Sequence, residues 1–104
     1  MSKYKLLIAV DLSTGMTEQI KNKMLFHIEQ LRDETQSPIH FLTFDQTVQS
    51  SFSLTDDVTK EDIGAKISSS QGETDFKCIF EEATKVGATN VSIFTNSSWH
   101  SAYL

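Results

Sequence analysis

Residues 6–10 form an unbroken apolar run, Leu-Leu-Ile-Ala-Val, that ends abruptly at Asp11. A short run of this kind is typical of a strand that is buried on both faces, as in a parallel sheet. Residues 16–35 follow with apolar side chains at three- and four-residue steps, which predicts an amphipathic helix that ends before Pro38. Residues 39–44 are again apolar on both faces, so we expect two parallel strands joined by a right-handed helical crossover.

The rest of the chain predicts four more elements. Residues 48–54 alternate between apolar and polar side chains, which indicates a half-exposed strand that pairs antiparallel with its predecessor through a short turn. Helices are expected over residues 59–67 and 75–86, and Gly87 closes the second one. Residues 89–95 predict a last core strand.

Together these elements predict an α/β fold with a three-layer, Rossmann-like and mostly parallel sheet. The expected spatial order of the strands, numbered along the chain, is 3-2-1-4, with one antiparallel edge strand and helices on both faces. Residues 1–104 are expected to form a single domain, because 104 residues with 38% hydrophobic side chains suit one core. Residues 96–104 are expected to be a loop followed by a short docked segment.

Charge and cysteine content argue against several classes of protein. The net charge of -5, from 9 basic and 14 acidic residues with no basic stripe, disfavours nucleic-acid binding. The one cysteine, Cys78, cannot form a disulfide within the chain, which fits a reducing compartment. The apolar run before Asp11 is too short for a signal-peptide core or a membrane span. We therefore expect a cytoplasmic protein that does not bind membranes.

Three polar loops are expected to meet at the carboxyl ends of the strands, where the strand order changes direction. They comprise residues 11–15, 72–75 and 95–98. A carboxylate with hydroxyl groups around it forms a hard-oxygen site, which suits Mg²⁺ or Mn²⁺.

These loops resemble the metal site of the von Willebrand factor A-like (VWA-like) domain family. Residues 7–13, Leu-Ile-Ala-Val-Asp-Leu-Ser, look like the family's first strand and its Asp-x-Ser-x-Ser metal motif. Residues 72–76, Gly-Glu-Thr-Asp-Phe, are similar to the Gly-Gly-Thr-Asp-Phe loop that supplies the family's metal-site threonine. Residues 91–96 resemble the strand that normally ends in Thr-Asp-Gly. The resemblance spans about residues 5–97 and implies a trimmed member of the family.

The resemblance also implies a degenerate site for a divalent cation. Gly15 replaces the second serine of the metal motif, and Asn96 replaces the closing aspartate, so one hydroxyl and one charge are missing. A carboxylate at position 75 would add a second acidic group nearby. The candidate metal ligands are Asp11, Ser13, Thr74, Asp75 and Asn96, and Mg²⁺ is the expected, weakly bound cofactor.

Simpler roles are open for these residues. Asp11 can cap the turn into the first helix, and Thr74 with Asp75 can cap the helix that follows them. Cys78 is expected to be a structural thiol, because no base is placed beside it. No pair of histidines has the spacing of metal ligands, and no phosphate-binding glycine loop is present.

The aromatic residues near the end of the chain suggest a contact surface. Trp99 and Tyr103 are candidate partner-binding residues, because aromatic side chains anchor interfaces, although they can equally dock on the domain's own core. The strand over residues 48–54 can also pair with another chain, and an open sheet edge after the last strand makes a homodimer possible.

Three functions are compatible with these features. The first is a non-enzymatic protein-interaction module that uses weakly bound Mg²⁺ to capture a partner protein. The second is a small metal-independent accessory or inhibitor protein, of the kind that a phage or mobile element encodes. The third is a small metal-assisted hydrolase, in which Asp11 and Asp75 form the carboxylate pair.

Overall fold

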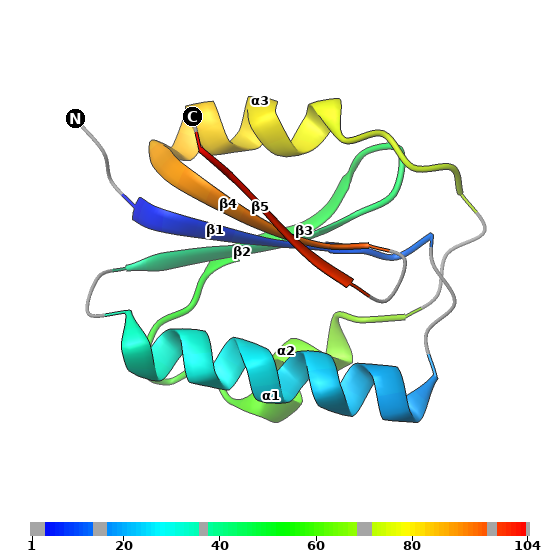
Figure 1. The fold of residues 1–104 in the computed structure, drawn as a ribbon, viewed down its shortest axis with the longest axis vertical. Coiled ribbons are helices and arrows are strands. Elements are labelled where there is room, and N and C mark those ends of the chain that lie inside the picture. The colour runs from blue at the N-terminus through cyan, green and yellow to red at the C-terminus, as the bar shows by residue number, and fades with distance from the viewer. Residues whose placement is uncertain (1–3, 14–16, 36–37, 69–71, 96–97, 104) are drawn as a thin grey trace.

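The chain folds into a five-stranded mixed sheet with helices on both faces (Figure 1). The computed structural model describes residues 4–13, 17–35, 38–68, 72–95 and 98–103. The elements in chain order are β1 (Tyr4–Asp11), α1 (Glu18–Glu34), β2 (Ile39–Phe44), β3 (Val48–Ser53), α2 (Lys60–Ala65), α3 (Lys77–Val86), β4 (Ala88–Thr95) and β5 (Ser98–Tyr103).

The strand order is β3-β2-β1-β4-β5. The central strand β1 is parallel to both β2 and β4, whereas β3 and β5 are antiparallel edge strands. The predicted 3-2-1-4 order is therefore present, but the prediction of one antiparallel edge strand was wrong. The segment expected to be a docked tail is strand β5, because its backbone pairs with β4 from Thr95 opposite Ser98 to Asn90 opposite Tyr103.

Alternate side chains of β1 supply two separate cores, one on each face of the sheet. Ile8 and Val10 pack with α1 and α2, whereas Leu7 and Ala9 pack with α3. Figure 1 shows the same division, with α1 and α2 on one side of the sheet and α3 on the other. This arrangement explains the unbroken apolar run, because both faces of β1 are covered.

Local sequence signals set the ends of the helices. Thr17 is the N-cap of α1, and its hydroxyl accepts a hydrogen bond from the amide of Ile20 at 3.2 Å. Gly87 ends α3 in the left-handed conformation, with φ of 78°, as its position in the sequence predicted. None of the helices in the described parts of the chain has the length and apolar character needed to cross a bilayer.

Candidate functional site

The carboxylate of Asp11 lies at the carboxyl end of β1 and is almost fully buried, with 1% of the residue exposed. The hydroxyl of Thr95 donates to its Oδ2 at 2.7 Å. The amide and hydroxyl of Ser13 donate to Oδ1 at 2.9 and 2.6 Å, and the hydroxyl of Thr74 donates to Oδ2 at 3.1 Å. The hydroxyls of Ser13 and Thr74 also contact each other. We refer to these four residues as the Asp11 cluster.

The fold brings the Asp11 cluster together from three distant segments. Thr95 ends β4, which runs parallel to β1 in a register that places Phe94 beside Val10. Thr74 precedes α3, and the next residue, Asp75, donates its amide to the carbonyl of Asp45 at 2.9 Å. The loop before α3 is thereby fixed to the turn after β2, on the side of Figure 1 where β1 and β4 end.

Burial of Asp11 requires strong local hydrogen bonding. A carboxylate removed from water is destabilised unless donors replace its hydration, and donors to a charged group stabilise by about 1.5–3 kcal/mol each. The hydroxyls of the cluster supply such donors, while Ser13 is half-buried and Thr74 is exposed. The cluster is therefore a buried anionic centre beneath hydroxyl oxygens that solvent can reach.

Three of the five candidate metal ligands meet in this cluster, namely Asp11, Ser13 and Thr74. Asp75 is exposed, and its Oδ1 accepts the amide of Lys77, the first residue of α3, at 2.9 Å. The N-cap of α3 is Phe76, which makes no side-chain cap hydrogen bond, so neither Thr74 nor Asp75 occupies the N-cap position considered for them. Asn96 lies outside the described residues, as does Gly15.

Thr95 is the member of the cluster that sequence reasoning did not select. It was placed in a loop at this end of the sheet and in the stretch that resembles the Thr-Asp-Gly strand end, but only its neighbour Asn96 was named as a candidate ligand. The available signal was that a hydroxyl residue ends the last core strand, which lies next to β1. Asp11 does not cap α1, because the N-cap of that helix is Thr17. Asp11 instead accepts a hydrogen bond from the amide of Ser13 in the turn after β1.

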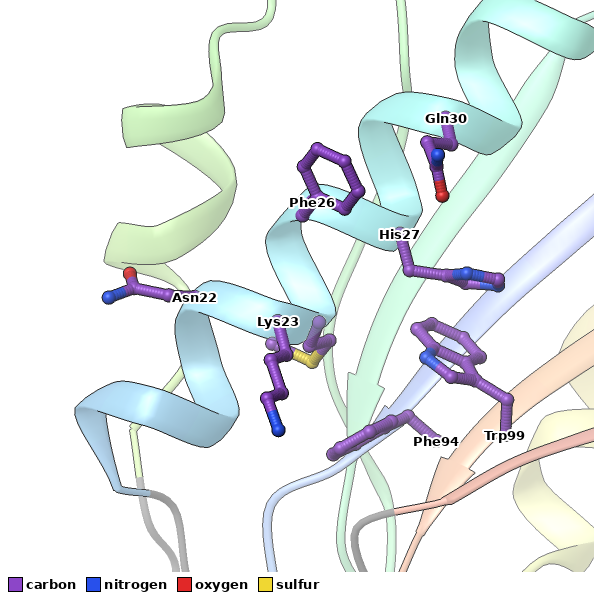
Figure 2. Close-up of a pocket in the computed structure, with 8 residues that line it drawn as sticks. Asn22, Lys23, Phe26, His27, Gln30, Phe94 and Trp99 are labelled. Carbon is purple, nitrogen blue, oxygen red and sulfur yellow. The ribbon is translucent and has the colours of Figure 1, made fainter.

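A second feature is an open groove of about 520 Å³ between α1 and the β4–β5 pair (Figure 2). Trp99 is half-buried there, with its ring centroid 4.6 Å from that of His27 and 5.2 Å from that of Phe94. Tyr103, the other candidate partner-binding residue, ends β5 opposite Asn90, and its side chain lies outside the described part of the structure. The groove is lined by Asn22, Lys23, Met24, Phe26, His27, Gln30, Phe94 and Trp99.

Neither the Cys78 thiol nor any grouping of metal-ligating side chains in the described residues provides a second candidate site. Burial, followed by the negative charge of Asp75, raises the pKa of the Cys78 thiol, so the reactive thiolate is disfavoured. Its sulfur donates to the carbonyl of Asp75 at 3.1 Å. Within the described ranges, no group of three or more His, Cys, Asp or Glu side chains is arranged to hold a metal ion.

The sequence matches a protein-family model described as VWA-like domain (DUF2201) over residues 6–102. Comparison with curated proteins and with solved structures gave no match. The family match runs from within β1 to nearly the end of β5, so it includes every segment that contributes to the Asp11 cluster.

Proposed function

The chain belongs to the VWA-like domain family, and from this premise we propose that it is a non-enzymatic protein-interaction module that binds Mg²⁺ weakly at the Asp11 cluster. The observation that carries the proposal is the convergence of three hydroxyls from separate segments on one buried carboxylate. An arrangement that serves only to cap a turn needs one donor from the turn itself. The additional donors from before α3 and from the end of β4 support a binding role.

The chemistry of the donor set suits a hard cation. Every side-chain donor in the cluster is an oxygen, the ligand type that Mg²⁺ prefers. A hydroxyl that donates its proton to Asp11 keeps its lone pairs for a cation, so the carboxylate also orients the hydroxyl oxygens. Ser13 and Thr74 would offer those oxygens directly, and Asp11 would supply the negative charge.

The same donor set favours weak binding. Among the residues that the structure describes, Asp11 is the only carboxylate with a hydrogen bond to the hydroxyls of the cluster, and Asp75 accepts the amide of Lys77. Mg²⁺ binds through few carboxylates and keeps several waters, which leaves positions for a further ligand. A carboxylate of a partner protein is the ligand that would complete the coordination, so the ion would couple the domain to an acidic residue of its partner.

Calorimetric titration of Mg²⁺ and Mn²⁺ into metal-free protein tests the cation site. We expect saturable heat for the wild type, no saturable heat for Asp11→Ala, and a reduced affinity for Ser13→Ala. Asp33→Asn, which removes one exposed acidic charge from α1, is the matched control and should bind as the wild type does. Circular dichroism of each variant separates loss of the site from loss of the fold.

The absence of heat in the wild type would overturn the cation site. The domain would then act as a metal-independent accessory or inhibitor protein that retains the fold, and the search for its partner would move to other surfaces. The non-enzymatic part of the proposal is tested with phosphoester and peptide substrates in the presence of Mg²⁺ or Mn²⁺. We expect no turnover, and metal-dependent hydrolysis that disappears in Asp11→Ala would contradict the proposal.

A further inference from the structure

The groove beside α1 is an apolar surface that the described part of the chain leaves open. Its floor and walls include Phe94, Trp99 and His27, and Figure 2 shows the ring of His27 facing that of Trp99. Phe26 lies on the same flank of α1, and 65% of it is exposed, the largest exposed fraction of any large hydrophobic residue in the described ranges. Exposed aromatic surface of this kind marks interaction sites.

The position of the groove in the fold indicates which structural element would fill it. On one side of α1 lies α2, where a Cβ on Gly64 would make ordinary van der Waals contact, at 3.5 Å, with the side chains of Leu25 and Lys21. The groove lies along one flank of α1. Two rows of side chains form this flank, residues 22, 26 and 30 in one row and residues 23 and 27 in the other, and successive members of each row are about one helical turn apart. A second helix packed beside α1 over β4 and β5 would extend this helical layer, since helices that cover a sheet pack side by side.

The charge of the groove indicates the composition of that helix. The lining contains one cationic side chain, Lys23, and no aspartate or glutamate, although the chain as a whole carries a net charge of -5. Lys23 is exposed and makes no ion pair within the described ranges. A helix with an apolar stripe and glutamate or aspartate along its flank would therefore match both the aromatic surface and the local positive charge.

We propose that this groove binds an acidic amphipathic helix of a partner protein. The inference rests on the proposed role as an interaction module, but it uses a surface other than the Asp11 cluster and requires no metal ion. Phe26 and Trp99 supply the apolar contacts, and Lys23 selects for acidic side chains.

The test uses a pair of designed helical peptides without tryptophan. Both carry leucine at i, i+3, i+4 and i+7 spacing, and their flanking residues are all glutamate in one peptide and all lysine in the other. Trp99 is the only tryptophan of the chain and lines the groove, so its fluorescence reports binding directly. The titration is done in EDTA, so that failure of the cation site does not affect it.

We expect saturable binding of the glutamate peptide and much weaker binding of the lysine peptide. Phe26→Ser should raise the Kd of the glutamate peptide by about tenfold, because truncation of a central aromatic contact has an effect of this size. Lys23→Glu should remove the preference between the two peptides. The matched controls are Phe76→Ser and Lys77→Glu, which change an exposed phenylalanine and an exposed lysine at the start of α3, and both should bind as the wild type does.

Three results would overturn the proposal. They are no saturable binding of the glutamate peptide, equal binding of the two peptides, and binding that is unchanged in both Phe26→Ser and Lys23→Glu. Light scattering adds a separate test of the occupant. A wild-type dimer that becomes monomeric in Phe26→Ser would show that a second copy of the chain fills the groove, which would also overturn the proposal. Because Phe26 is exposed, Phe26→Ser leaves the core intact, and circular dichroism checks this directly.

Discussion

At the scale of single residues, Asp11 is the position on which the candidate site depends. Its selection as a candidate follows from the sequence, because a carboxylate that ends a buried parallel strand lies at the carboxyl end of the sheet, where ligands bind in such folds. The presence of Ser13 and Thr74 was implied by a motif resemblance, and the structure brings both to Asp11. Thr95 lies in the stretch that resembles the Thr-Asp-Gly strand end but was not selected, and the register between β1 and β4 places its hydroxyl on the carboxylate.

Thr95→Val is expected to lower the free energy of unfolding by about 1–3 kcal/mol, because it removes a buried donor to a carboxylate while keeping the side-chain shape. Urea denaturation measures the change. Thr89→Val is the matched control, since Thr89 also lies in β4 and its hydroxyl donates at 3.2 Å to the backbone carbonyl of Lys5. The control should lose clearly less stability than Thr95→Val. Equal losses would show that the hydrogen bond to Asp11 contributes no more to the free energy of unfolding than the bond from Thr89 to the backbone.

At the scale of elements, α2 shows how a short helix is specified locally. Thr59 and Asp62 form a capping box, in which the amide of Thr59 donates to Asp62 at 2.9 Å and the amide of Asp62 donates to the hydroxyl of Thr59 at 3.1 Å. The sequence predicted a helix in this region, although the helix is shorter than expected. Strand β5 was missed, because Ser98–Tyr103 has no strong strand pattern and its conformation follows from pairing with β4.

Thr59→Val is expected to destabilise the protein by about 1 kcal/mol, because valine cannot accept a hydrogen bond at the N-cap. Thr84→Val, at an exposed site inside α3, serves as the control and should change stability by about 0.5 kcal/mol or less. Urea denaturation at neutral pH compares the two variants, and equal losses would count against the capping role.

The capping box also predicts a pH dependence. The backbone amide of Thr59, followed by its hydroxyl, lowers the pKa of Asp62 below its ordinary value of 3.8. A lowered carboxyl pKa stabilises the folded state above the ordinary pKa, and this contribution is lost as the pH falls through the lowered value. The stability difference between wild type and Asp62→Asn should therefore be present at neutral pH and disappear in acid. A difference that is independent of pH would contradict this assignment.

At the scale of the whole molecule, β1 couples two cores that share no buried side chain. Leu7 and Ile8 are both fully buried, but they face α3 and the α1–α2 layer respectively. Loss of packing on either face therefore disturbs the strand that supports the other face. We expect the domain to unfold as one cooperative unit, as small single domains usually do.

Leu7→Ala tests this coupling. It is expected to lower the free energy of unfolding by about 2–5 kcal/mol, because it leaves a cavity in the core on the α3 side. The fluorescence of Trp99, which packs against the opposite core, should shift its urea midpoint by the same amount as far-UV circular dichroism. Lys5→Ala, at an exposed position of β1, should change neither midpoint appreciably. An unchanged Trp99 transition in Leu7→Ala would show that the two faces unfold separately.

The sequence by itself determined the features that depend on local periodicity and on short motifs. These are the parallel strands β1, β2 and β4, the amphipathic character of α1, the stop at Gly87 and the position of Asp11 at the end of a buried strand. Apolar spacing and turn chemistry act over a few residues, so they can be recognised in the chain alone.

The tertiary structure decided the features that depend on pairing between distant segments. The place of β5 as an edge strand of the sheet, the hydrogen bond from Thr95 to Asp11 and the groove between α1 and Trp99 belong to this group. Each of them depends on strand register or on the direction of a single side chain. Strand register and side-chain direction are fixed only when the two cores pack on both faces of β1. A local sequence pattern could therefore not predict these features.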